Sequence, residues 1–326
     1  MTRWALVGAL LLGLGAPTVA QGVAVNSVRF SPDGTQLVTA ASDRTLRVYD
    51  SATGALVQTL PGHDDYVVHV AWLADGRGLA SASYDGTVKL WDLATGELTR
   101  TLRGHTGTLF YVDASPDGTR LATTATEGEL IVWDLTTEPG APDEIAWRTQ
   151  AHDEVTAAAR FSPDGALLVT AGRGALLKLW NAATGDEIAS WRPAGLSFVT
   201  AGFSPDGQRV AGAGSSGKVV VYDIAGDSGG EASVAPVPIA TFDAGGFVNA
   251  LTFARGGTHV AAACGDGTLR LWSLETGDEV WRVRADADIA FFVDAAPDEQ
   301  TLATVGQGTT IKLWEASSGE RLRTIR

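Results

Sequence analysis

After about residue 22, short apolar stretches alternate with polar positions and glycine-containing turns along the whole chain. In the segment SYDGTVKLWD, which covers residues 83–92, Asp-Gly predicts a tight turn, and the residues after it alternate as in a half-buried strand. The surrounding repeat predicts four strands, over about 67–72, 78–83, 87–91 and 98–102. One isolated hairpin of this kind is only marginally stable, so its repetition along the chain has to be explained.

Two landmarks recur at a fixed separation in seven copies. The first is a turn of the SPDG type, at 31–34, 73–76, 115–118, 162–165, 204–207, 254–257 and 296–299. The second is an aromatic residue that ends an alternating strand: Tyr49, Trp91, Trp133, Trp180, Tyr222, Trp272 and Trp314. In every copy the aromatic follows the second turn residue by 17 positions, and successive aromatics are 42, 42, 47, 42, 50 and 42 residues apart.

Seven four-stranded meanders of this length predict an all-β fold, a seven-bladed β-propeller of four-stranded antiparallel blades. Each blade can bury its two faces only against its neighbours, which explains why the hairpin is repeated. We expect the propeller over residues 21–326, with blades at approximately 23–60, 64–102, 106–149, 153–192, 196–241, 246–284 and 288–326.

The repeats resemble those of the WD-repeat family over about residues 23–326. The motifs that carry the resemblance are LWD at 90–92, LWN at 179–181, VYD at 48–50 and 221–223, IVWD at 131–134, and Gly-His at 62–63 and 104–105. The form LWD-x-ATG at 90–96 is similar to bacterial members of the family.

The resemblance implies a side-chain network of His, Ser or Thr, Asp and Trp inside a blade. The second copy matches it fully, with His63, Ser81, Asp85 and Trp91, and the third offers His105, Thr123, Glu127 and Trp133. The fourth keeps His152, Thr170 and Trp180, but has Gly174 at the Asp position. His63 and Asp85 could also be interpreted as a catalytic dyad; we favour a structural role, because these groups satisfy one another within one blade.

The N-terminal segment predicts a secretory signal peptide over residues 1–20. Arg3 precedes an apolar run from about Ala5 to Ala16, and Thr-Val-Ala at 18–20 favours cleavage before Gln21. The alternative is a membrane anchor, but the apolar run is shorter than the roughly 20 residues that a spanning helix needs. We therefore expect an exported protein, periplasmic or extracellular and of bacterial type, with no membrane insertion after cleavage.

Composition narrows the classes of partner. The formal net charge is −14, and the sequence contains only four lysines, so binding to nucleic acid is not expected.

The single cysteine, Cys264, stands in the apolar run VAAAC and cannot form an internal disulfide. It is expected to be a small buried side chain.

Two further expectations concern the ring. The first strand after the signal peptide already belongs to the first blade, so we expect a ring that closes without strand exchange, by packing of the seventh blade on the first. Insertions at 136–144 and 225–238 lengthen the third and fifth blades on the face of the SPDG-type turns. Their Pro, Gly and Ser content is typical of surface loops.

No catalytic, metal-binding or cofactor-binding motif is found in the sequence, so we expect no enzyme activity, no metal and no cofactor. The opposite face of the ring carries aromatic and polar residues near its axis, where WD-repeat propellers often bind partners. The positions are Tyr66, Val68, His69, Tyr84, Phe110, Tyr111, Phe247, Asn249, Phe291 and Phe292. Of these, Tyr66, Tyr84, His69, Phe110 and Phe247 are the predicted partner-binding residues.

The function that the sequence favours is a monomeric, non-enzymatic scaffold that binds a protein or peptide through its loop faces. A propeller hydrolase or lactonase with a metal site in the channel is one alternative, and a carbohydrate-binding module is another.

Overall fold

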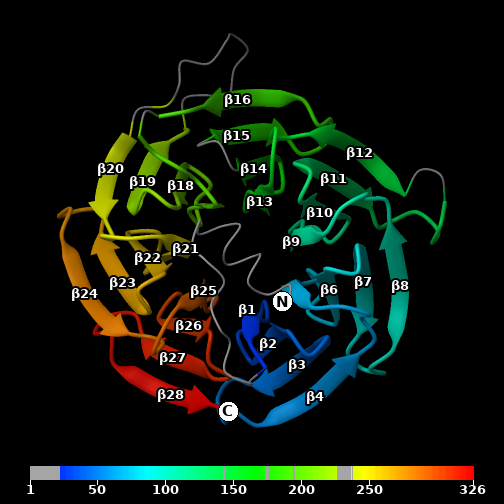
Figure 1. Cartoon of the computed structure of the whole chain (residues 1–326), viewed down its shortest axis with the longest axis horizontal. Helices are drawn as coiled ribbons and strands as arrows, with labels where there is room; N and C mark the ends of the chain where they lie inside the picture. Colours follow the sequence, from blue (N-terminus) through cyan, green and yellow to red (C-terminus); the bar gives the residue numbers. More distant parts are fainter. Residues whose placement is uncertain (1–22, 142–143, 173–175, 194, 226–235, 237) are drawn as a thin grey trace, which may run out of the picture.

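The computed structural model describes residues 23–141, 144–172, 176–193, 195–225, 236 and 238–326. These residues form seven four-stranded antiparallel sheets, arranged as blades around a central axis (Figure 1). The predicted fold class, an all-β seven-bladed propeller, is therefore confirmed. In each blade the first strand lies nearest the axis and the fourth lies at the rim, as β1 and β4 do in Figure 1.

The blades are built from four consecutive strands each. Their bounds are β1 Val25–Phe30, β2 Gln36–Ala41, β3 Thr45–Asp50 and β4 Leu56–Pro61; β5 Val67–Trp72, β6 Gly78–Ser83, β7 Thr87–Asp92 and β8 Leu98–Arg103; β9 Leu109–Ala114, β10 Arg120–Ala125, β11 Glu129–Asp134 and β12 Ile145–Gln150; β13 Thr156–Phe161, β14 Leu167–Gly172, β15 Leu176–Asn181 and β16 Glu187–Trp191; β17 Thr200–Phe203, β18 Arg209–Ala213, β19 Lys218–Asp223 and β20 Pro238–Asp243; β21 Val248–Ala254, β22 His259–Cys264, β23 Thr268–Ser273 and β24 Glu279–Arg284; β25 Ala290–Ala295, β26 Thr301–Gly306, β27 Ile311–Glu315 and β28 Arg321–Ile325.

The SPDG-type turn joins the first and second strands of a blade and holds them in register. In the first blade, Ser31 Oγ donates to Asp33 Oδ1 at 2.6 Å, and the amide of Gly34 donates to the carbonyl of Ser31 at 2.8 Å. Gly34 has a φ of 73°, a left-handed conformation that glycine adopts without steric cost. The same serine-to-aspartate hydrogen bond recurs at Ser115, Ser162 and Ser204, so it stabilises this turn in four of the blades.

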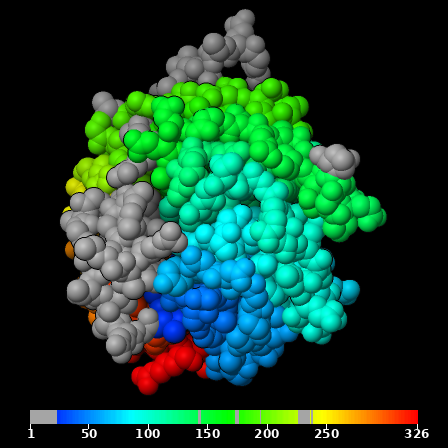
Figure 2. All heavy atoms as spheres, turned by 45° about the vertical axis from the view of Figure 1, so that its right-hand side comes forward, coloured from blue at the N-terminus to red at the C-terminus, as the bar shows by residue number. Residues whose placement is uncertain are grey.

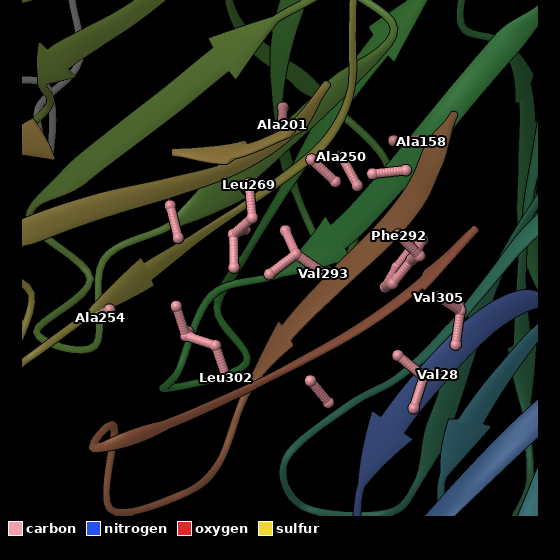
Figure 3. Close-up of a cluster of buried hydrophobic side chains, with 14 of the residues drawn as sticks. Val28, Ala158, Ala201, Ala250, Ala254, Leu269, Phe292, Val293, Leu302 and Val305 are labelled. Atoms are coloured by element: carbon pink, nitrogen blue, oxygen red, sulfur yellow. The ribbon is translucent and has the colours of Figure 1, made fainter. Parts of the chain in front are cut away.

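The core lies between the blades. Val28 on β1, Val70 on β5 and Val112 on β9 are completely buried, and each occupies the same position of an innermost strand. Figure 3 shows how such side chains from several blades meet, with Val293 of β25 and Val28 of β1 in one cluster. Burial between neighbouring blades is therefore the main source of stability, as the repeated pattern predicts.

The junction between the seventh and the first blade closes the ring. Among the described strands, β25–β28 form the last sheet without a strand from elsewhere, as predicted. Arg29 Nη1 on β1 pairs with Asp294 Oδ1 on β25 at 2.8 Å, and the amide of Phe30 donates to Asp294 Oδ2 at 3.0 Å. One carboxylate on the last blade therefore holds both a side chain and the backbone of the first.

The same junction is also closed at the rim. Arg323 Nη1 on β28 donates to the carbonyl of Thr53 in the first blade at 2.7 Å. Ile325 is only 4% exposed. A Cβ atom added to Gly54 of the first blade would lie only 3.0 Å from the Ile325 side chain, so the outer strand of the seventh blade packs tightly on the first. Figure 2 shows the red C-terminal atoms beside the blue first blade.

Several sequence predictions fall partly or wholly outside the described residues. The signal peptide at 1–20 lies wholly outside them, as do residues 142–143, 226–235 and 237 of the two insertions. In the parts of the chain that are described, there is no helix long and apolar enough to cross a membrane.

The closure predicts a specific weakness. Asp294→Ala should destabilise the protein by about 3 kcal/mol, because it leaves the largely buried Arg29 without its carboxylate. Thermal unfolding measures the loss, and hydrogen exchange should accelerate first in β1 and β25. Asp298→Ala, which removes an exposed carboxylate from the turn of the same blade, is the control. Equal stability of the two variants would contradict the assigned closure.

Candidate functional site

Three aromatic residues of the predicted binding set come together beside the second blade. Tyr66 precedes β5, Tyr84 lies between β6 and β7, and Phe110 is on β9. The ring centroids of Tyr66 and Tyr84 are 6.1 Å apart, and those of Tyr84 and Phe110 are 6.3 Å apart in an edge-to-face arrangement. The two tyrosines are half-buried, so part of each residue remains accessible. We call Tyr66, Tyr84 and Phe110 the aromatic cluster.

The hydroxyl group of Tyr84 is buried and has no hydrogen-bond partner among the described residues. Burial, and then the nearby charge of Asp65, raises the pKa of Tyr84 far above its ordinary value. The side chain is therefore neutral at physiological pH. Its phenol O–H can donate to a partner's acceptor only after a small local rearrangement.

The other predicted partner-binding residues lie elsewhere. Phe247 is half-buried at the start of the sixth blade, away from the aromatic cluster in sequence and blade. His69 is only 2% exposed: its ring stacks on Tyr111 with centroids 3.8 Å apart, and its Nδ1 donates to the carbonyl of Val112 at 2.9 Å. The predicted surface contact by His69 is therefore wrong, because this side chain is buried against Tyr111 and Val112.

In the second blade the four residues of the implied network are all in contact. His63 Nδ1 lies 2.7 Å from Asp85 Oδ2, and His63 Nε2 lies 2.7 Å from Ser81 Oγ. Trp91 Nε1 donates to Ser81 Oγ at 2.9 Å. Burial would raise the pKa of Asp85, but hydrogen bonds from His63 and Thr87 hold it far below its ordinary value. Every polar group of this chain of contacts is occupied within the blade, which favours a structural role over a catalytic dyad.

In the third blade one expected member is replaced. His105 Nε2 lies 2.7 Å from Thr123 Oγ1, to which Trp133 Nε1 also donates at 2.7 Å. The carboxylate 2.8 Å from His105 Nδ1 belongs to Glu129 on β11, and not to Glu127, although the two atoms lack the geometry of a hydrogen bond. Glu127 precedes the strand and instead accepts from Thr126 Oγ1 at 2.6 Å, because it is a turn residue.

The contact between His105 and Glu129 is not a charged pair. Burial, and then Arg148, lowers the pKa of His105 to about 4, and burial raises the pKa of Glu129. The imidazole is therefore neutral at pH 7. In the fourth blade His152 makes the equivalent contact with Thr170 Oγ1 at 3.0 Å, while Gly174 lies outside the described residues.

The innermost strands place two layers of side chains in the central channel. The deeper layer contains His69, Tyr111 and Phe292, which are 2%, 5% and 8% exposed. These three side chains are packed together and are nearly inaccessible to solvent. The ring of His69 also lies 5.2 Å from that of Phe292.

The second layer is charged and lies closer to the SPDG-type turns. Each repeat contributes one residue to it, located three positions before the second residue of the SPDG-type turn. These residues are Arg29, Ala71, Asp113, Arg160, Gly202, Thr252 and Asp294. Tyr111 joins the two layers, because its hydroxyl oxygen accepts from Arg29 Nη2 and from Arg160 Nε, both at 2.7 Å.

The charges of this layer are held in different ways. Burial opposes the charge on Arg29, but Tyr111, Asp294 and Asp113 keep the pKa of its guanidinium above the ordinary value, so it stays charged. Asp113 Oδ2 accepts from the amide of Phe161 on the next blade at 2.9 Å, as Asp294 does from Phe30. Burial raises the pKa of Asp113, although Arg29, the Phe161 amide and Arg160 oppose that effect.

The charged layer opens into a cavity of about 340 Å³ at the turn end of the channel. Its lining includes Arg29, Asp113, Arg160, Thr252 and Glu299. The apolar part of the lining comes from Phe161, Phe203, Phe253, Pro116, Pro163, Pro205 and Pro297. We call this cavity the channel pocket. A volume of this size is in the range of pockets for small molecules.

Sequence reasoning missed the charged layer. The segments FYVDA at 110–114 and FFVDA at 291–295 are nearly identical, and their aspartates occupy the same repeat position. Comparing that single position across all seven copies identifies Arg29, Asp113, Arg160 and Asp294 together. No group of three or more metal-ligating side chains gathers anywhere in the described part of the chain.

The fold and the repeated His, Ser or Thr, and Trp contacts define a WD-repeat β-propeller. A family model described as the IFT122 first beta-propeller matches residues 24–228, and one described as WD domain, G-beta repeat matches residues 236–273. The chain therefore belongs to the family of the IFT122 first beta-propeller, and the WD-repeat resemblance seen in the sequence is confirmed.

Curated relatives share a short segment with the chain. It is 52% identical over 48 residues to the intraflagellar transport protein 122 homolog of Homo sapiens, 50% identical to that of Danio rerio and 48% identical to that of Xenopus tropicalis. In each case the matched segment is 15% of this chain and 4% of the relative. The similarity to these proteins therefore spans little more than one repeat.

The buried histidines predict a pH dependence of stability. The pKa values of His105 and His152 are both lowered to about 4, against about 6.5 in an unfolded chain. Between these values the unfolded chain binds protons that the folded protein does not. Stability is therefore full above pH 6.5 and falls as the pH is lowered towards 4, by about 2–3 kcal/mol for each histidine.

Thermal unfolding from pH 7 to pH 4 measures this effect. The double variant His105→Gln/His152→Gln should be less stable than the wild type at pH 7, but should lose less stability on acidification. If the two proteins show the same pH dependence, the histidines are not held neutral by burial.

Proposed function

We propose that the chain is an exported, non-enzymatic propeller that binds a protein or peptide at the aromatic cluster. WD-repeat propellers are a protein-interaction scaffold type, which supports the general role. The observation that carries the proposal is the grouping of Tyr66, Tyr84 and Phe110 from two neighbouring blades. Intraflagellar transport, named in the relatives, is not carried over, because the shared segment is 4% of their length.

The mechanism would be rigid display of a preformed surface. Tyr66 and Tyr84 lie in connections at the ends of strands whose backbone is fixed by antiparallel pairing, as between Val67 and Ser83. The partner would therefore meet aromatic rings that lose little conformational freedom on binding. Aromatic side chains with one apolar face and one polar group are frequent energetic centres of protein interfaces.

Affinity capture from the envelope fraction of the producing cell tests the binding role. The bait is the chain without residues 1–20, and the comparison is the double variant Tyr66→Ala/Tyr84→Ala. The control is Leu56→Ala/Leu98→Ala, which removes exposed apolar side chains from the outer strands β4 and β8. We expect a protein that is retained by the wild type and the control and lost, by about tenfold or more, with the tyrosine variant.

Equal retention by all three baits would show that the aromatic cluster is not the binding surface. A glycan array serves as the parallel measurement, because selective binding of a sugar that depends on Tyr66 and Tyr84 would favour the carbohydrate-binding alternative over a protein partner.

Export is proposed on the sequence of residues 1–20 alone. When the full chain is produced in a bacterial host, we expect a mature protein that begins at Gln21 and is recovered outside the cytoplasm. N-terminal sequencing of the fractionated protein measures this, and a chain beginning at Gln21 by design, after an initiating Met, is the cytoplasmic control. Recovery of the uncleaved chain in the cytoplasm would contradict export.

A further inference from the structure

The channel pocket contains a positive and a negative group that do not satisfy each other. Arg160 donates Nε to Tyr111, but its Nη2 is buried and has no acceptor among the described residues. No ion pair joins Arg160 to Asp113, or to any other carboxylate in the described ranges. Arg29, in contrast, donates Nη1 to Asp294 and Nη2 to Tyr111.

A glycine in the next blade leaves space beside the Arg160 guanidinium. Position 202 of the fifth blade is the neighbour of Arg160 in the charged layer, and it is a glycine. A Cβ there would lie 3.2 Å from Arg160 Nη1, tighter than an ordinary contact. The absent side chain therefore keeps space for the guanidinium at the edge of the pocket.

Four charged side chains line the pocket: Arg29, Arg160, Asp113 and Glu299. Arg29 is already paired with Asp294, which does not itself line the pocket. Glu299 is already occupied, since its Oε2 accepts from the amides of Gly256 and Gly257 at 2.6 and 3.1 Å. The groups left for a ligand are thus the Arg160 guanidinium and the Asp113 carboxylate.

We propose that the channel pocket binds a free α-amino acid with an apolar side chain. The ligand's carboxylate would accept from Arg160, and its ammonium group would donate to Asp113. The apolar side chain would lie against Phe161, Phe203 and the turn prolines, and the aromatic layer of His69, Tyr111 and Phe292 would close the inner end. This site lies at the other end of the channel from the aromatic cluster and does not depend on the proposed protein partner.

A thermal-shift screen of the standard amino acids, each at about 5 mM, is the first measurement, because a ligand of the folded state raises the melting temperature. We expect apolar amino acids such as L-leucine to raise it and acidic or basic ones not to. If no amino acid changes the melting temperature, the proposal is wrong.

Isothermal titration calorimetry then separates the two charges. L-leucine is compared with L-leucinamide, which lacks the carboxylate, and with 4-methylpentanoate, which lacks the ammonium group. We expect each analogue to bind about tenfold or more weakly than L-leucine. If 4-methylpentanoate binds as tightly as L-leucine, the pocket recognises an anion and not a zwitterion, and the proposal is overturned.

Two variants test which side chain binds the carboxylate of the ligand and which binds its ammonium group. Arg160→Gln should weaken the binding of L-leucine and of 4-methylpentanoate but not of L-leucinamide, and Asp113→Asn should weaken L-leucine and L-leucinamide but not 4-methylpentanoate. Asp113→Asn keeps a side-chain oxygen for the Phe161 amide. Arg209→Gln is the control, since Arg209 donates to the carbonyl of Gly257 at 3.4 Å at the same end of the ring without lining the pocket. Unchanged L-leucine binding in both variants would place the ligand elsewhere.

Discussion

Closure of the ring is the constraint on which the rest of this structure depends. A four-stranded blade has two apolar faces and cannot bury either of them alone, so all seven blades need both neighbours. At six junctions the chain itself connects the neighbours. At the seventh, the first and last blades must hold each other without a shared strand among the described residues, and Asp294 does this by binding Arg29 and the amide of Phe30.

This closure also shapes the channel. The aspartate that closes the ring has a counterpart in Asp113, which binds the amide of Phe161 between the third and fourth blades. Tyr111 accepts from an arginine on each side, so the two junctions are linked across the axis through one hydroxyl group. The groups that hold the blades together therefore also give the turn end of the channel its charged lining.

The sequence predicts the fold well because the repeat is local. The separation of 17 residues between turn and aromatic recurs in every copy, and each copy carries its own turn signal, so seven independent segments support one architecture. The contacts of His63, Ser81, Asp85 and Trp91 follow from the family resemblance. The resemblance predicts Glu127 as the acid beside His105, but Glu129 occupies that place. Which of the two acids reaches His105 depends on where β11 begins.

The channel could be predicted only in part. Tyr111 and Phe292 are visible as aromatics near the axis, but their burial depends on how seven strands converge, which no single repeat determines. The charged layer has arginine in two copies, aspartate in two and an uncharged residue in the other three, so it does not appear as a motif. Its members become apparent only when one position is compared across the repeats, and their pairing depends on which blades are adjacent in space.

A crystal structure of the chain from Gln21 onwards would test the central claim most directly. The account predicts seven blades of four consecutive strands, with Asp294 bound to Arg29 and the Phe30 amide, and with Arg160 facing the channel pocket without a carboxylate partner in the protein. A segment from elsewhere in the chain completing the seventh blade, or Arg29 paired with a residue other than Asp294, would contradict it.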